Sequence, residues 1–432
     1  MKKIVFIGAG SIVFAKNLIG DCMLTPALRD SEFALLDIDK EKLTLSAEIL
    51  QSLNRNVNEG RATVRAYDVQ REALKNADYV INAIQVGGYP CIINDFEIPL
   101  KYGLKQTYAD TLGIGGIFRG LRTIPVLLQI AREMEEVCPD AWLLNYTNPM
   151  AIVTGAIQRA TKIKTVGLCH SVQVCAGDLL AGLGMNNENI QYKIAGINHQ
   201  AWLLGITQNG VDLYPEIKRR AAQRTEKHED LVRYEIMKQF GYYVTESSQH
   251  SAEYMPYFIK DKYPELIEKY GIKTFLYRDW EGFWKEHWDK IKKELLDSKK
   301  ITHERTQEFA SYILEALVTG KLYKIAANVL NHGYITNLPQ NSCIEVPCIV
   351  DAGGISPCFT GALPPQCAAL NQSNINVQNL AIEAGLSGHR QHIYHAAMLD
   401  PHTAAELSLE DIVKMCDELI EANKMWLTNM KF

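Results

Sequence analysis

The stretch Ile4-Val5-Phe6-Ile7-Gly8-Ala9-Gly10-Ser11 decides the fold of this chain. Its apolar run is typical of a buried strand, and the glycines that follow allow a tight turn into a helix beyond Ser11. Backbone amides at the start of such a helix can bind a pyrophosphate. Val13 stands where the third glycine of the usual fingerprint would be, so a plain tight turn is the alternative. We predict that Gly8, Gly10 and Ser11 contact a dinucleotide.

The first half of the chain alternates short apolar runs with amphipathic stretches, which is the pattern of β-α units in a parallel sheet. We expect strands at residues 4–7, 33–36, 63–66, 79–83, 142–145 and 164–168. Right-handed crossovers would wind them into one twisted sheet with helices on both faces. The sequence therefore predicts an α/β fold whose N-terminal part is a Rossmann-like, doubly wound sheet.

Beyond about residue 195 this alternation weakens, and helical patterns appear at residues 306–319 and 404–422. A chain of 432 residues is longer than one hydrophobic core usually supports, so two domains are expected. We place them at residues 1–195 and 196–432, the second being a mixed α+β domain. The Lys, Glu and Asp residues of 285–300 are typical of a solvated helix face.

Composition excludes several functional classes. The chain is 47% hydrophobic and 22% charged with a net charge of −5, so we expect a globular protein that does not bind nucleic acid. The first apolar run reaches Gly8 after four residues, too short for a secretion signal, and no run of about 18 apolar residues predicts a membrane span. A cytoplasmic protein is expected. Its 10 cysteines should be reduced and mostly buried, with one available for chemistry.

A carboxylate follows the second expected strand. In Leu35-Leu36-Asp37-Ile38-Asp39, Asp37 lies 27 residues after Gly10, near the spacing at which an acid contacts the ribose diol of a dinucleotide. A carboxylate at this place favours NAD over NADP. Asp37 is the first candidate and Asp39 the second, and either could instead be a helix N-cap. Asn82, at the end of the fourth strand, lies at the edge where such sheets bind ligands.

Polar segments follow later strands or loops at the same edge. They are Tyr108-Ala109-Asp110-Thr111-Leu112-Gly113, Asn145-Tyr146-Thr147-Asn148-Pro149-Met150, Gly167-Leu168-Cys169-His170-Ser171 and Ala195-Gly196-Ile197-Asn198-His199. The last segment supplies an imidazole about thirty residues after the thiol of Cys169. These segments would crowd polar side chains around one site.

The sequence resembles glycoside hydrolase family four, the NAD- and manganese-dependent glycosidases, over nearly the whole chain, and within it the α-galactosidase (melibiase) branch. The resemblance is carried by Phe6-Ile7-Gly8-Ala9-Gly10-Ser11, the segments from Asn145 and Gly167 quoted above, Gly196-Ile197-Asn198-His199, Thr245-Glu246-Ser247-Ser248 with Glu253-Tyr254, and Tyr394-His395-Ala396-Ala397-Met398. It implies a fold of the lactate/malate dehydrogenase type, with NAD and Mn²⁺ as cofactors. It also implies an exception to the usual two-carboxylate mechanism of glycosidases.

The resemblance implies that Cys169 and His199 bind Mn²⁺ and that substrate oxygens complete the coordination. From the residues alone zinc or iron would be expected, because a thiolate is soft and manganese prefers oxygen. A buried thiol and a core histidine are the alternative for this pair. Asn148 matches the asparagine that holds substrate hydroxyls, and its alternative is an Asx turn before the following proline. We group Asn145 with the cofactor-binding residues.

The resemblance also assigns the catalytic groups. Tyr254 matches the tyrosine that we take as the base, and His250 is a competitor for this role. Asp110 and His170 flank the same site. Many family members have an acid directly after the metal-binding cysteine, where this chain has His170, so the residue that protonates the leaving group stays open.

The mechanism that the resemblance implies is a transient redox and elimination cycle. Hydride passes from C3 of the sugar to NAD⁺, and the metal stabilises the enolate formed when the C2 proton leaves. The aglycone is eliminated, water adds, and C3 is reduced again, so the cofactor is not consumed. A 2-hydroxyacid dehydrogenase would need an Arg clamp and a His acid-base, of which we find no convincing set. A non-catalytic NAD-binding sensor would leave Cys169, His199 and Tyr254 without a common purpose.

We expect the substrate to be an unphosphorylated α-galactoside such as melibiose. Family members that act on 6-phosphosugars carry basic residues near the loop after the fourth strand, whereas residues 84–93 of this chain include no Arg or Lys. Arg119 or Arg390 could reach the pocket from elsewhere. Because galactose is chosen by resemblance alone, α-glucosidase and α-galacturonidase or glucuronidase activities are the alternatives. The family also suggests a homodimer or homotetramer.

Overall fold

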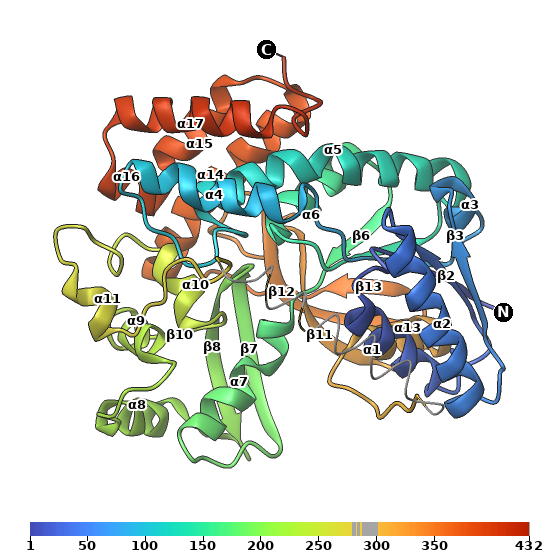
Figure 1. The fold of residues 1–432 in the computed structure, drawn as a ribbon. Coiled ribbons are helices and arrows are strands. Elements are labelled where there is room, and N and C mark those ends of the chain that lie inside the picture. The colour runs from blue at the N-terminus through green and yellow to red at the C-terminus, as the bar shows by residue number, and fades with distance from the viewer. Residues whose placement is uncertain (279–281, 283–285, 287–300, 432) are drawn as a thin grey trace.

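The computed structural model describes residues 1–278, 282, 286 and 301–431, and a single mixed β-sheet runs through it (Figure 1). Its strands are β1 (Lys3–Ile7), β2 (Glu32–Leu36), β3 (Thr63–Tyr67), β4 (Tyr79–Asn82), β5 (Trp142–Asn145), β6 (Lys164–Gly167), β7 (Ile190–Ile197), β8 (Gln200–Gln208), β9 (Val211–Asp212), β10 (Tyr243–Val244), β11 (Tyr323–Leu330), β12 (Cys343–Asp351) and β13 (Gly354–Pro357). The main order is β10-β8-β7-β12-β11-β6-β5-β4-β1-β2-β3, with β9 on β8 and β13 on β12. Strands β1 to β6 are parallel. All six predicted strands are confirmed, with ends that differ by at most one residue.

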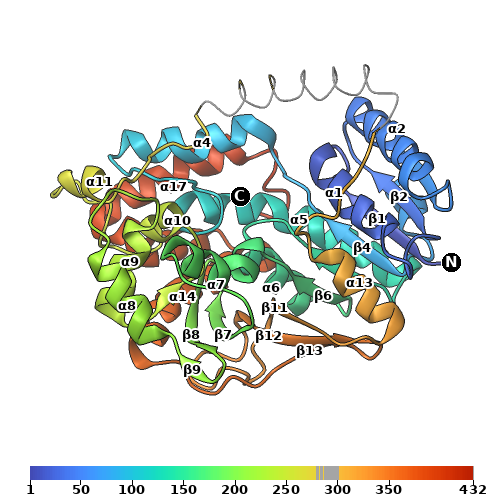
Figure 2. The same ribbon diagram turned by 90° about the horizontal axis from the view of Figure 1, so that it is seen from below.

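Helices cover both faces of this sheet (Figures 1 and 2). They are α1 (Ile12–Met23), α2 (Lys40–Val57), α3 (Gln70–Leu74), α4 (Gly88–Lys101), α5 (Gly113–Val137), α6 (Met150–Ala160), α7 (His170–Gly182), α8 (Tyr214–Gln223), α9 (Leu231–Phe240), α10 (Ser248–Glu253), α11 (Glu265–Lys269), α13 (Ala310–Thr319), α14 (Pro365–Ser387), α15 (Gln391–Leu399), α16 (Pro401–Glu406) and α17 (Leu409–Asn423). In Figure 1, α4, α5, α14, α15 and α17 lie together in the upper part, and Figure 2 shows α1, α2 and α13 grouped near β1 and β2.

Alternate residues of the parallel strands point into two different cores. Ile4 and Phe6 of β1 pack in one core with residues of α1, α2 and α13. Val5 and Ile7 pack in the other with residues of α5, α6, α14 and α17. Because successive side chains of a strand face opposite sides, a strand that is covered on both sides must be apolar at every position. This is why the opening run of the sequence is continuous and not alternating.

The sheet continues past residue 195. The hairpin of β11 and β12 lies between β6 and β7, and it pairs with β6 through Asn328 and Gly167 and with β7 through Glu345 and Gly196. Its strands run antiparallel to their neighbours, so the second half is a mixed α+β arrangement, as the sequence predicts. The domain boundary at residue 195 stays a prediction.

Two helices in the second half differ from the sequence expectation. The pattern at residues 404–422 is divided between α16 and α17, because Ser408 accepts a hydrogen bond from the amide of Asp411 and caps a new helix. The helix expected from residue 306 begins at Ala310. The charged segment 285–300 lies outside the described residues except for Glu286.

Among the described helices α5 is long and apolar enough to cross a membrane, but 78% of its most apolar window is buried, as in a core helix.

Candidate functional site

The glycine turn after β1 lies where β2 and β4 end. Gly8 has a φ of +92°, and a Cβ there would stand 2.7 Å from the carbonyl oxygen of Ala83. The amide of Gly10 donates to Oδ2 of Asp37 at 2.6 Å, and a Cβ on Gly10 would stand 2.7 Å from that oxygen. Ser11 is exposed beside the first turn of α1. Glycines at positions 8 and 10 allow these close approaches, and the amides of residues 8–11 are all bonded within the protein. The amides in the first turn of α1, which Ser11 does not cap, and the Ser11 hydroxyl are therefore the groups that fit a dinucleotide phosphate.

The two acids after β2 differ in their contacts. Asp39 is the N-cap of α2, and its carboxylate accepts from the amide of Lys42 at 3.1 Å. This is the alternative that the sequence leaves open, and it engages Asp39 within the helix. Asp37 bonds the glycine turn and the amide of Asp39 at 2.9 Å. Because Asp37 is the acid of the two that contacts the glycine turn, it is the better candidate for the ribose contact.

Asn82 and Asn145 form a buried network below the edge. Nδ2 of Asn82 donates to Oδ1 of Asn145 at 2.8 Å and to Oγ1 of Thr147 at 3.0 Å. Nδ2 of Asn145 donates to the carbonyl of Thr147 and to Oγ1 of Thr154. Both asparagines are fully buried, and their amides tie the loop after β5 to β4. Their predicted contact with the cofactor stays a prediction, beside this structural role.

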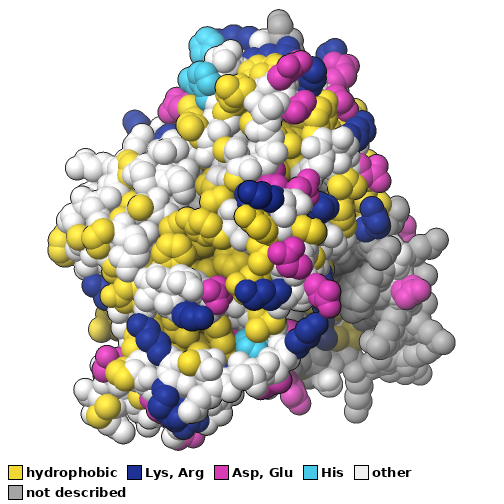
Figure 3. All heavy atoms as spheres, turned by 90° about the vertical axis from the view of Figure 1, so that its left-hand side faces the viewer, with side chains coloured by type: hydrophobic (Ala, Val, Ile, Leu, Met, Phe, Trp, Pro, Cys, Tyr) yellow, Lys and Arg dark blue, Asp and Glu magenta, His cyan; other side chains and the backbone are white. Residues whose placement is uncertain are grey.

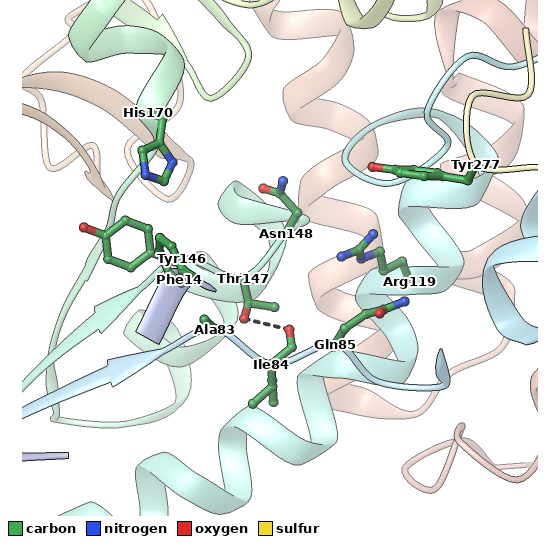
Figure 4. Close-up of a pocket in the computed structure, with 10 residues that line it drawn as sticks. All are labelled: Phe14, Ala83, Ile84, Gln85, Arg119, Tyr146, Thr147, Asn148, His170 and Tyr277. Carbon is green, nitrogen blue, oxygen red and sulfur yellow. Dashed lines mark hydrogen bonds between the residues drawn. The ribbon is translucent and has the colours of Figure 1, made fainter. Parts of the chain in front are cut away.

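A pocket of about 230 Å³ opens above this network (Figure 4). It is lined by Phe14, Ala83, Ile84, Gln85, Arg119, Tyr146, Thr147, Asn148, His170 and Tyr277. In Figure 4 the Asn148 side chain lies between those of His170 and Arg119. Its Oδ1 is buried and has no hydrogen-bond partner among the described residues. A buried polar atom without a partner is costly, so this amide fits a role in binding a polar ligand.

Three possible metal ligands meet at the next loops of the same edge. Cys169 is the N-cap of α7, His199 lies in the turn between β7 and β8 with a φ of +63°, and Glu246 follows β10. One donor atom of each lies within 4.8 Å of the other two. Ligands on opposite sides of one ion stand up to ~4.8 Å apart, since metal–ligand bonds are roughly 2.0–2.4 Å long. The residues therefore fit one divalent ion.

The structure brings the two predicted ligands, Cys169 and His199, together and adds Glu246, which the sequence analysis had given no role. A signal was present, because Glu246 is the acid of the Thr245-Glu246-Ser247-Ser248 segment that the resemblance includes. A carboxylate also removes the difficulty over manganese, since it supplies the oxygen donor that manganese prefers.

Charges in this cluster stabilise one another. Burial would lower the pKa of His199, but the carboxylate of Glu246 and the thiol of Cys169 raise it to about 10. Burial would raise the pKa of Glu246, but the imidazoles of His199 and His250 lower it to about 2. Oε2 of Glu246 lies 3.3 Å from Nε2 of His199. An ionised carboxylate at this depth attracts a cation, either a protonated imidazole or a metal ion.

Tyr254 and His250 lie behind and beside the cluster. The Tyr254 hydroxyl is 2.9 Å from Nδ1 of His199, and its ring is almost completely buried. Burial, followed by the charges of Asp110 and Glu253, raises the pKa of Tyr254 well above its ordinary value. His250 stacks on Tyr108 with ring centroids 3.8 Å apart. Both candidates for the base are therefore present at the site.

Asp110 joins the cluster to the pocket. Its carboxylate lies 3.6 Å from Nε2 of His250 and 3.7 Å from Nη1 of Arg119, and it accepts from the Tyr277 hydroxyl at 3.1 Å. Burial would raise the pKa of Asp110, but His250 and Arg119 hold it well below its usual range. Arg119 and Tyr277 line the pocket. Asp110 is thus an ionised link between the pocket and the metal cluster.

Glu253 holds the loop that carries Asp110. Its carboxylate accepts from the amides of Thr107 at 2.6 Å, Tyr108 at 3.2 Å and Ala109 at 3.2 Å. Ala109 has a φ of +52°, a conformation that such bonds stabilise. The sequence alone indicates no such role for Glu253, which it shows only as the residue before Tyr254.

His170 stands at the wall of the pocket. It is the first residue of α7, and its side chain is 52% exposed. Its Nε2 lies 2.7 Å from Oε2 of Glu308, which sequence reasoning did not identify. The structure thus brings together all the predicted catalytic, metal and substrate residues at one edge of the sheet.

This fold and site are those of an enzyme class that combines a dinucleotide-type sheet with a candidate metal site of a thiol, an imidazole and a carboxylate. The chain matches the description "Family 4 glycosyl hydrolase" over residues 3–185 and "Family 4 glycosyl hydrolase C-terminal domain" over residues 194–403. The chain belongs to family 4 of the glycosyl hydrolases. It is a glycosidase on a Rossmann-like scaffold, as the resemblance implies.

This chain matches two curated relatives over most of their length. The chain is 56% identical over 433 residues to an alpha-galactosidase of Bacillus subtilis (strain 168), covering 100% of both proteins. It is 36% identical over 438 residues to an alpha-galactosidase of Rhizobium meliloti (strain 1021), covering 98% of this chain and 89% of that protein.

Solved structures confirm the fold. The 6-phospho-beta glucosidase from Thermotoga maritima with manganese, NAD⁺ and glucose-6-phosphate has a TM-score of 0.81 at 23% identity, covering 99% of both chains. Lactate dehydrogenase from Eimeria maxima with NADH and oxamate has a TM-score of 0.52 at 16% identity, covering 89% of this chain and 95% of that one. The expected likeness to lactate dehydrogenase is confirmed for the fold.

Proposed function

We propose that this family 4 enzyme is an α-galactosidase that hydrolyses unphosphorylated α-galactosides such as melibiose with NAD and Mn²⁺. The 56% identity to a protein named alpha-galactosidase, over the whole of both chains, supports the substrate. The observation that carries the reaction type is the cluster of Cys169, His199 and Glu246 at the edge of a dinucleotide-type sheet. A glycosidase that works with two carboxylates has no need of such a cluster.

The residues fit both cofactors. We assign the metal to Cys169, His199 and Glu246, and the dinucleotide to the glycine turn and Asp37. When bound, NAD accepts hydride from C3 of the sugar and returns it, while the metal polarises the sugar oxygens next to the reacting carbons. The Thermotoga maritima structure contains both manganese and NAD⁺.

Tyr254 is the base that removes the C2 proton. Nε2 of His199 faces Glu246, so this nitrogen is the one directed to the metal. A neutral imidazole that uses Nε2 as a ligand carries its hydrogen on Nδ1, which lies 2.9 Å from the Tyr254 oxygen. Nδ1 therefore donates to this oxygen and stabilises the phenolate, which offsets the cost of burying its charge.

His250 is the weaker candidate for the base. Its Nδ1 lies 3.0 Å from Oγ of Ser247, and its Nε2 faces Asp110 at 3.6 Å. Both ring nitrogens are thus directed at protein groups. His250 is therefore better placed to hold the neighbouring acidic side chains in position than to remove a proton from a sugar carbon.

An uncharged sugar suits the pocket. The loop after β4 contributes Ile84 and Gln85 to the lining and no cation. Arg119 does reach the pocket, but it lies beside the ionised Asp110, whose negative charge offsets the positive charge of the guanidinium. Arg390 bonds Asp417 and Tyr394 and is not a lining residue. The positive charge that a phosphate would meet at Arg119 is therefore already offset by a neighbouring carboxylate, which supports a substrate without phosphate.

The test is a comparison of kcat/KM for melibiose, maltose, an α-galacturonide and a 6-phosphorylated α-glucoside with NAD⁺, Mn²⁺ and a thiol reductant. We expect melibiose to be preferred and deuterium at C2 of an α-galactoside to slow turnover. A preference for the phosphorylated sugar contradicts the pocket argument, and a preference for maltose or the galacturonide changes the substrate. Stoichiometric NADH formation with a substrate would indicate a dehydrogenase.

A cytoplasmic homodimer or homotetramer, without nucleic-acid or membrane partners, completes the proposal. All 10 cysteines are unpaired, which suits a reducing compartment. The face at the left of Figure 1, where α9, α10 and α11 lie, shows hydrophobic side chains gathered between charged ones (Figure 3). Between α10 and α11, Tyr257 is 50% exposed and Tyr263 is 45% exposed. Light scattering after size-exclusion chromatography would measure the assembly, and a monomeric mass would contradict this part.

A further inference from the structure

A carboxylate from the second half of the chain bonds the pocket histidine. Oε2 of Glu308 lies 2.7 Å from Nε2 of His170, and the Glu308 side chain is 13% exposed. His170 follows Cys169 and lines the pocket, whereas Glu308 lies two residues before α13. A carboxylate only accepts hydrogen bonds, so Nε2 of His170 carries the hydrogen of this bond.

The segment that carries Glu308 is fixed to α1. The buried carboxylate of Asp21 accepts from Nε2 of His303 at 2.8 Å, and from the amide and the hydroxyl of Thr306 at 2.9 and 2.6 Å. The Thr306 hydroxyl oxygen accepts in turn from the amide of Glu308 at 3.1 Å. Phe309 packs against the His170 ring with centroids 5.6 Å apart. The contact between Glu308 and His170 is therefore built into the fold.

We infer that Glu308 is a positioning residue, which holds His170 in the orientation that protonates the leaving-group oxygen of the glycoside. The inference rests on the proposed function and answers a question that the sequence leaves open. The bond to Glu308 engages Nε2, and Nδ1 of His170 has no hydrogen-bond partner among the described residues. Nδ1 of His170 is therefore available to a substrate in the pocket, while Nε2 bonds the protein.

The elimination step moves one proton to Tyr254 and one proton from His170. Tyr254 takes the C2 proton, and the electron pair of the C2–H bond becomes the second bond between C1 and C2. The C1–O bond breaks, its electron pair stays on the leaving oxygen, and this oxygen takes the Nδ1 proton of His170. On the return, water bonds to C1 and gives a proton to Nδ1, while C2 recovers its proton from Tyr254.

The test compares two α-galactosides that differ in their need for protonation. Nitrophenolate leaves without a proton, whereas the sugar alkoxide of melibiose does not. We expect Glu308→Ala to lower kcat/KM for melibiose by about 10²-fold, the cost of a misplaced catalytic group, and that for 4-nitrophenyl α-galactoside by only a few-fold. Glu308→Gln, whose amide oxygen can still accept from Nε2, should recover most of the loss. Glu304→Ala is the matched control, because Glu304 is an exposed acid of the same segment.

Hydrogen exchange at C2 gives a second measurement. When the leaving group departs slowly, the C2 proton is removed and restored many times before cleavage. Melibiose recovered from D₂O with the Glu308→Ala enzyme should therefore carry deuterium at C2, more than with the wild type. An equal loss on both galactosides, or a loss of NAD⁺ binding in Glu308→Gln, would overturn the inference by showing a purely structural role. A wild-type enzyme that cleaves neither galactoside would instead overturn the proposed function on which the inference rests.

Discussion

Removal of the charge of Glu246 distinguishes a metal site of three side chains from one of two. Glu246→Gln keeps the size of the side chain and an oxygen atom but removes the negative charge. At an effective dielectric constant near 20, opposite unit charges 4 Å apart attract by about 4 kcal/mol, and a divalent ion doubles this value. The amide oxygen of glutamine, or a water molecule beside it, can still contact the ion and recovers much of that energy. We expect a loss of about 3 kcal/mol, which is roughly a 10²-fold weaker Kd for Mn²⁺.

Calorimetric titration of the metal-free protein with Mn²⁺ in the presence of NAD⁺ measures this change directly. Glu265→Gln is the matched control, because it removes the charge of an exposed glutamate on α11. Cys169→Ser and His199→Ala should weaken Mn²⁺ binding in the same assay, while NAD⁺ binding is retained. A Kd for Mn²⁺ that Glu246→Gln leaves within about twofold of the wild type would refute the three-ligand site.

Three further changes test other parts of the structure. Tyr254→Phe should lower kcat by about 10²–10⁴-fold while Mn²⁺ binding persists. If His250→Ala instead loses activity and Tyr254→Phe keeps it, His250 is the base and Tyr254 is not. Burial raises the pKa of Glu345 from 4.5 to about 7, so its contribution to stability is full below pH 4.5 and is lost as the pH rises through 7. Glu345→Gln should therefore flatten the fall in the free energy of unfolding across this range, which denaturation at several pH values would reveal. Despite burial, His303 and Thr306 lower the pKa of Asp21, so its stabilisation is present above pH 3.8 and is lost in acid. Asp21→Asn should unfold at a lower temperature at pH 7 and show a weaker dependence of Tm on acid, and an unchanged Tm would contradict the anchoring of the 303–309 segment.

The parallel half of the fold could be predicted because its signals are local. A continuous apolar run followed by Gly8 and Gly10 specifies a strand that is covered on both faces and a turn that approaches two neighbouring strands. The same local reasoning made Asp37 the first candidate for the ribose contact, which stays a prediction. Its helix-cap alternative for Asp39 is confirmed, since the N-cap of α2 depends on residues within one helical turn.

The rest of the site depends on contacts between distant segments. Glu246 meets Cys169 and His199 only because β10 joins the far edge of the sheet, and no periodicity in the sequence indicates this pairing. Glu308 reaches His170 across an even longer separation of 138 residues. The pairing of Cys169 with His199 came from the resemblance, because a thiol and an imidazole thirty residues apart have no spacing that specifies a shared metal.

The hairpin of β11 and β12 makes the metal site a late product of folding. Cys169 follows the end of β6 by two residues, and His199 follows the end of β7 by the same number. These two strands are neighbours of the hairpin and not of each other, so their separation is set by a segment that is synthesised much later. When Cys169 and His199 have both been synthesised, the β11–β12 hairpin that separates their strands has not yet been made. We therefore expect affinity for the metal to arise only when the hairpin is inserted, so that metal uptake during refolding would report the completion of the sheet.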